Sequence, residues 1–80
     1  MAQKTVNSKT LERLLRVLPD LIGLPVHRLW SDYDKDADVL YLSFERPQKA
    51  TDSIMRDDGI LLRYRGKRLV GVTVFDASKR

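Results

Sequence analysis

The 80-residue sequence contains no cysteine and only one histidine and one tryptophan. Without cysteine the chain can form neither a disulfide nor a thiolate zinc site, and such a composition usually indicates a reducing compartment, so we expect a cytoplasmic protein. The longest apolar runs, such as residues 39–42, are far shorter than the roughly 20 residues of a membrane helix. The first nine residues also lack the apolar segment of a secretion signal. The sequence therefore predicts a soluble protein with no membrane contact.

The sequence also lacks the residue sets of enzymes. It shows no nucleophile with a base beside it and no glycine-rich loop for phosphate. Its single histidine, His27, has no second histidine or cysteine near it, which favours a surface or core-edge role over a ligand or base. Carboxylates are numerous, but they fall in predicted turns, where nothing predicts the burial that raises a pKa for acid-base catalysis. We expect no enzyme, no catalytic residue and no cofactor.

One aspartate-rich segment resembles a calcium-binding loop. Asp34, Asp36, Asp38 and Glu45 occupy the first, third, fifth and twelfth positions of that motif. The sixth position must be glycine to make a sharp turn, and here it is Val39. The segment also runs into an obvious strand. We therefore expect a solvated turn and no specific metal site.

Length and charge both suggest association. A chain of 80 residues forms one domain, residues 1–80, and buries only about 60% of its extended surface, so its core is small. The net charge of +4 is unevenly distributed: residues 1–30 carry five Lys/Arg and two acids, residues 31–59 four and eight, and residues 60–80 six and one. Such a division fits self-association as well as it fits a nucleic-acid surface.

The spacing of four leucines predicts an amphipathic helix over residues 8–23, preceded by a flexible tail over residues 1–7. Asn7 or Ser8 can cap its amino terminus. Pro19 disfavours the helical state before it, so the helix should stop at Leu18 or restart as one short turn before Gly23. The leucines form a single stripe at i, i+3, i+4 and i+7: Leu11, Leu14, Leu15 and Leu18.

The alternation of apolar and polar residues, with turn residues between the runs, predicts an antiparallel sheet of four to five strands over residues 26–76, built from hairpins. The expected strands cover residues 26–33, 39–45, 50–56, 60–64 and 70–74, and the third is polar enough to lie at an edge. The fold class is therefore α+β. The only predicted helix should cover one face of this sheet, since an antiparallel sheet buries one face against another element. That face bears Leu40, Leu42, Phe44, Leu62, Val72 and Val74.

The register of the last hairpin can be argued from its side chains. A two-residue loop at Gly66-Lys67 would place Arg65 opposite Arg68 and Leu62 opposite Gly71, which pairs like charges and divides the apolar face. A loop of odd length avoids both problems and keeps one continuous apolar face. The expected pairs are then Arg65 with Leu69, Tyr64 with Val70, Leu62 with Val72 and Ile60 with Val74.

Three runs in the chain resemble a known family. They are YDKDADVLYLSF at residues 33–44, DDGILLRY at residues 57–64 and LVGVTVFDAS at residues 69–78. Together they are similar to the bacterial family called domain of unknown function twenty-two eighty-three. The resemblance implies a small, soluble, β-rich protein without an established activity. Some members are encoded beside small toxin-like proteins, which implies an antitoxin-like or partner-binding role. The leucine-striped helix before Trp30 is not part of the family pattern.

Two functions follow as hypotheses. The first is a protein-interaction module, either an antitoxin-like partner of a small toxin or a homodimer. Val39, Tyr41 and Leu61 fall on the second face of the sheet and add more apolar surface than one helix can cover, so we expect them to bind the partner. The alternative is weak nucleic-acid binding by a basic hairpin tip, where four cations surround Tyr64, although no base-reading element is visible. Those cations are Arg63, Arg65, Lys67 and Arg68.

Overall fold

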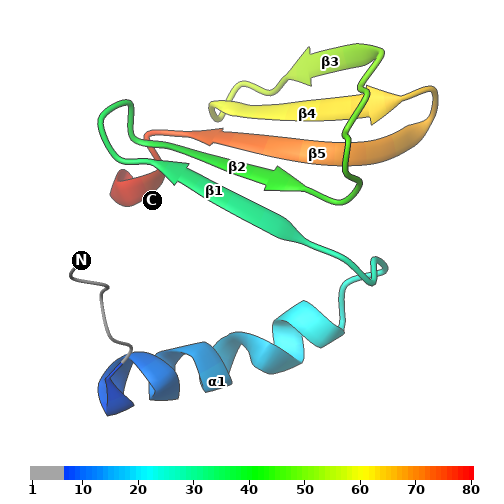
Figure 1. The fold of residues 1–80 in the computed structure, drawn as a ribbon. Helices are drawn as coiled ribbons and strands as arrows, with labels where there is room; N and C mark the ends of the chain where they lie inside the picture. The colour runs from blue at the N-terminus through cyan, green and yellow to red at the C-terminus, as the bar shows by residue number, and fades with distance from the viewer. Residues whose placement is uncertain (1–6) are drawn as a thin grey trace.

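A computed structural model describes residues 7–80 and shows one helix, a five-stranded antiparallel sheet and a short 3-10 helix (Figure 1). The strand order is β1-β2-β5-β4-β3. The α+β class and the sheet are confirmed, and the predicted tail lies, except for Asn7, outside the described residues. No helix in residues 7–80 is long and apolar enough to cross a membrane. The elements are α1 (Ser8–Ile22), β1 (Trp30–Asp34), β2 (Val39–Ser43), β3 (Asp52–Met55), β4 (Ile60–Arg65), β5 (Arg68–Phe75) and η1 (Ala77–Lys79).

The strands form where the alternating residues predict them; β1, β2 and β3 are shorter than expected, whereas β4 and β5 are longer. β1 begins at Trp30 and not at residue 26, because the preceding residues lie against the end of the helix. β3 is the edge strand expected from its polar sequence. The turn between β1 and β2 is closed by Asp34, whose Oδ1 accepts hydrogen bonds from the amides of Asp36 and Ala37 at 3.1 Å. This is the behaviour of aspartate in tight turns.

The β4–β5 hairpin departs from the predicted register. It has the two-residue loop, with Arg65 opposite Arg68 and Tyr64 opposite Leu69, so the predicted odd loop is wrong. The register shifts between Arg63 and Tyr64, which leaves Val70 as an extra residue in β5. A β-bulge of this kind lets a tight turn and a continuous apolar face coexist. Two predicted pairs are therefore still formed, Leu62 with Val72 and Ile60 with Val74.

α1 extends through Pro19 to Ile22, close to the predicted range of 8–23, and does not stop at Leu18. Its amino terminus is capped by Asn7, whose Oδ1 accepts a hydrogen bond from the amide of Thr10 at 2.9 Å. A proline this near the end removes only one intrahelical donor. The Gly23 amide donates to the Pro19 carbonyl at 3.0 Å and closes the last turn.

The position of α1 departs from the prediction. The helix stands apart from the sheet on the side of β1 (Figure 1), and none of its residues is buried. The radius of gyration is 14.4 Å, whereas a compact chain of this length has about 11.6 Å. The expected packing of the helix on the sheet is therefore not formed within one chain. The six residues assigned to the covered face are only half-buried: Leu40, Leu42, Phe44, Leu62, Val72 and Val74.

Candidate partner-binding surface

The first part of the candidate surface is the apolar side of α1, which we call the helix stripe. The side chains of Leu11, Leu14 and Leu15 are 46%, 48% and 51% exposed, and that of Ile22 is 80% exposed. In globular proteins a stripe of this width faces a core. Here it faces outward, so six apolar side chains of one helix are available to another surface. They are Leu11, Leu14, Leu15, Leu18, Leu21 and Ile22.

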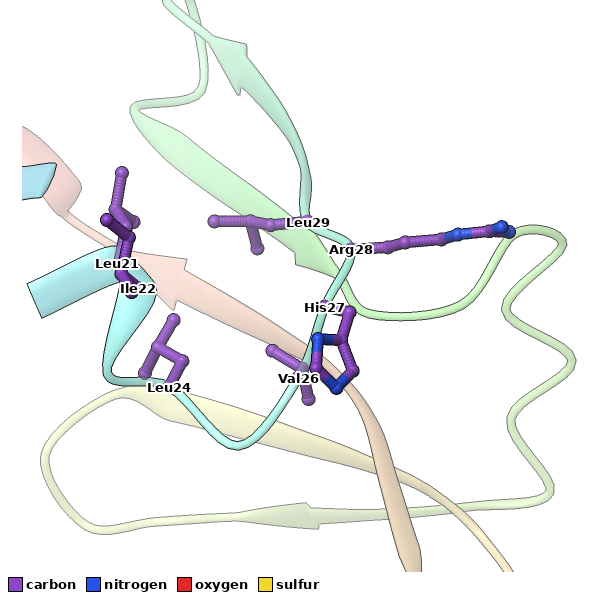
Figure 2. Close-up of a pocket in the computed structure, with 7 residues that line it drawn as sticks. All are labelled: Leu21, Ile22, Leu24, Val26, His27, Arg28 and Leu29. Carbon is purple, nitrogen blue, oxygen red and sulfur yellow. The ribbon is translucent and has the colours of Figure 1, made fainter.

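The second part is a concavity where α1 meets the linker to β1 (Figure 2). Its volume is about 440 Å³, and Leu29 from the linker points back toward Leu21 and Ile22 at the helix end. The Leu24 amide donates to the Leu21 carbonyl at 3.3 Å, which folds the chain back directly after the helix. The lining is otherwise completed by residues of the linker. These are Leu24, Val26, His27 and Arg28.

His27 is exposed on the linker, with Arg28 beside it pointing away from the concavity (Figure 2). Among residues 7–80, no three histidine or carboxylate side chains are grouped so that they could hold a metal ion. The histidine therefore lines an apolar junction without a ligand set around it. This placement agrees with the surface role that its isolation in the sequence suggested.

The third part is one face of the sheet, which we call the apolar sheet face. Cross-strand pairing places Leu42, Val72, Leu62 and Ile54 in one row, and the next row contains Tyr33. None of these side chains is buried, and Tyr33 and Ile54 are about half exposed. No element within residues 7–80 shields this face. The complete face consists of Tyr33, Leu40, Leu42, Ile54, Ile60, Leu62, Val72 and Val74.

The opposite face holds the residues predicted to bind a partner, and the structure separates them. Val39 is only 5% exposed, so it belongs to the small core and offers no surface. Tyr41 is 45% exposed and Leu61 is half-buried, and both lie beside the buried Thr73 in a cross-strand row. The expectation of an open apolar patch there is therefore reduced to Tyr41 and Leu61.

The β2–β3 connection covers part of this second face (Figure 1), and sequence patterns gave no signal for it. Gln48 lies directly over Gly71, and a methyl group on that glycine would be 2.0 Å from the Gln48 amide nitrogen. The Gln48 side chain donates to Ser43 Oγ at 2.8 Å and accepts from Arg63 Nε at 2.9 Å. A glycine is needed in β5 because the glutamine occupies the space of a side chain.

The basic hairpin tip is divided by its contacts. Arg63 is held by the Gln48 side chain on the sheet, and Arg68 forms an ion pair with Glu45. Arg65 and Lys67 are exposed at the tip. Phosphate binding needs several cations on one surface, and two of the four predicted ones are already engaged with other side chains. The nucleic-acid alternative remains a prediction, and no contact among residues 7–80 favours it.

The aspartate-rich turn serves the fold. The Tyr33 hydroxyl donates to Asp38 Oδ1 at 2.6 Å, and the Ser78 hydroxyl donates to Asp38 Oδ2 at 2.8 Å. These hydrogen bonds, first from Tyr33 and then from Ser78, hold the pKa of Asp38 below its usual value. The same bond is the main reason that the pKa of Tyr33 is raised. Asp38 thus connects the β1–β2 turn to η1. The position of Asp38 in the sequence run YDKDADVLYLSF did not indicate this long-range contact.

These features define a small α+β protein with an open sheet and an exposed amphipathic arm. The family model described as protein of unknown function (DUF2283) matches residues 30–78, and the chain belongs to this family. The matched residues begin with β1 and end in η1, so α1 and its linker lie outside the match. Neither the curated proteins nor the solved structures gave a match to this chain.

Proposed function

We propose that the protein is an interaction module that binds another protein chain through the helix stripe. The observation that carries this proposal is the exposure of the stripe on an intact, capped helix, where every stripe side chain except the half-buried Leu18 is exposed. An isolated helix of 15 residues is only marginally stable in water, and packing normally supplies most of its stability. A partner surface would supply the packing that this sheet does not.

The total surface of the chain supports the same proposal. It is 6880 Å², whereas a compact monomer of 9.3 kDa exposes about 5,000 Å². Six fully extended residues expose about 950 Å² by the same scaling. Subtracting this area for residues 1–6 leaves the chain with about 1,000 Å² more surface than the compact monomer. A standard protein interface buries about 800 Å² on each partner. The excess is thus large enough for one complete interface.

The partner in this proposal is either a second copy or, as the family resemblance implies, a small toxin-like protein. The absence of cysteine suits a cytoplasmic complex. The basic residues of α1 point away from the stripe and take no part in the contact proposed for it. These residues are Lys9, Arg13 and Arg16.

The test compares the native mass of three purified variants, and of the same variants added to an extract of the native host. In Leu14→Gln/Leu15→Gln the stripe is interrupted, and in the control Arg13→Gln/Arg16→Gln the same residue type is placed on the polar side. Glutamine is nearly as good a helix former as the residues replaced, so helicity should persist in both.

We expect the wild type and the control to be in complexes larger than 9.3 kDa in at least one of the two preparations. Completing the burial of a half-exposed leucine contributes about 1 kcal/mol, so the loss of two should weaken binding about 30-fold. A wild-type protein that is monomeric in both preparations would refute the proposal. A stripe variant that binds as well as the control would refute the assigned surface.

A further inference from the structure

We infer that the partner of the helix stripe is a second copy of this chain, with α1 of each copy lying on the apolar sheet face of the other. This inference rests on the proposed function, because it names the partner of the same helix. The chain carries two uncovered apolar surfaces, one on α1 and one on the sheet, and neither covers the other within a copy. A reciprocal dimer covers both surfaces of both copies with one symmetric interface.

The two surfaces fit each other in shape. α1 has 15 residues and is therefore about 22 Å long, while five strands spaced by about 4.8 Å extend over about 19 Å. The helix stripe is also broad, because its residues continue at i+10 and i+11 with Leu21 and Ile22. A helix with so broad a stripe suits a flat sheet face, whereas a two-stranded coiled coil uses a narrower seam.

The junction explains why the helix does not cover its own sheet. The amides of Gly23 and Leu24 donate to carbonyls of the last helical turn, and Leu29 points back to that turn (Figure 2). The linker is thus folded around its own apolar concavity and holds α1 beyond the β1 side of the sheet. A helix held out in this way is placed to exchange between copies.

The area of exposed surface is also large enough for a second copy. The excess surface of about 1,000 Å² per chain also exceeds the roughly 800 Å² that each partner buries in a standard interface.

The test uses single-cysteine variants, because the natural chain has no other thiol. Leu15→Cys marks the helix stripe, Leu40→Cys and Ile54→Cys mark two places on the apolar sheet face, and Arg16→Cys marks the polar side of α1. Purified pairs are mixed, one copy carrying a mass tag, and treated with a short bismaleimide. We expect Leu15→Cys to form at least tenfold more tagged heterodimer with one of the two sheet variants than Arg16→Cys does.

Other outcomes overturn the inference. Cross-links of Leu15→Cys only to itself would show helix-to-helix pairing, and a product within one chain of Leu15→Cys/Leu40→Cys would show that the helix closes on its own sheet. Leu15→Cys could also give no more heterodimer than Arg16→Cys with either sheet variant while the wild type forms a complex in host extract. This result would show that the partner is another protein. The proposed function would then stand and this inference would fail, whereas a monomer in every preparation would remove both.

Discussion

Replacing Gly71 by alanine should destabilise the protein through one side chain, that of Gln48. The new methyl group would lie 2.0 Å from Gln48 Nε2 and 2.6 Å from its Cδ, so the glutamine has to move. Moving it breaks the hydrogen bonds to Ser43 Oγ and from Arg63 Nε. The β2–β3 connection then loses its attachment to the centre of the sheet.

The size of the effect follows from these two bonds. A neutral hydrogen bond contributes about 1 kcal/mol and one to a charged group about 1.5–3 kcal/mol. The gain from replacing glycine in the unfolded chain, about 0.4–1 kcal/mol, offsets part of this loss. The net destabilisation should be about 2 kcal/mol, which lowers the melting temperature of a domain this size by about 8–16 °C.

The assay is a double-mutant cycle measured by thermal and urea unfolding at one fixed protein concentration. It contains the wild type, Gly71→Ala, Gln48→Ala and the double variant. Once Gln48 is shortened, the Leu42 carbonyl oxygen at 3.0 Å is the remaining close neighbour of the methyl group, so Gly71→Ala should cost clearly less than in the wild type. An equal cost of Gly71→Ala in both backgrounds would refute the reasoning, because the clash would then be with the backbone and not with Gln48.

Three further predictions concern other parts of the molecule. The pKa of Asp38 is lower in the folded protein than in the unfolded chain, so its carboxylate stabilises the fold at pH values above the usual aspartate pKa. This stabilisation is lost as the pH falls through the lowered pKa of the folded state. Urea midpoints measured from pH 2 to 7 should show the loss in the wild type and not in Asp38→Asn. Leu42→Asp places a carboxylate on the apolar sheet face, and burying this carboxylate against a second copy costs several kcal/mol. A folded variant with the wild-type spectrum and the wild-type oligomeric state would show that this face is not buried in a complex. If the hairpin tip binds DNA, Arg65→Ala/Arg68→Ala should weaken binding and flatten its salt dependence together, and no binding of the wild type at low salt would eliminate this alternative.

The parts of the fold that local patterns determine were predictable from the sequence. Asn7 caps the helix, Leu40 and Leu42 lie on one face of β2, and the polar β3 lies at the edge. Each of these depends on neighbouring residues or on a period of two, which a single sequence displays.

The remaining features depend on contacts between distant residues. The bulge at Val70 combines a tight turn with an apolar register, and neither preference alone reveals it. The place of Gln48 over Gly71 likewise joins two elements that no periodicity connects. The sequence pattern placed Val39, Tyr41 and Leu61 on an exposed patch, whereas Val39 is buried and the exposed apolar residues lie on the helix stripe and the apolar sheet face.

Sedimentation equilibrium of the purified wild type tests the central claim most directly. The stripe variant Leu14→Gln/Leu15→Gln and the control Arg13→Gln/Arg16→Gln are measured beside it. The protein concentration is varied over 1–100 µM, on the order of the concentrations at which small homodimers form. The account predicts about twice the chain mass of 9.3 kDa for the wild type and the control, and the mass of one chain for the stripe variant over most of that range. A wild type that stays at 9.3 kDa throughout would contradict the reciprocal dimer. A stripe variant as dimeric as the control would contradict the role given to the helix.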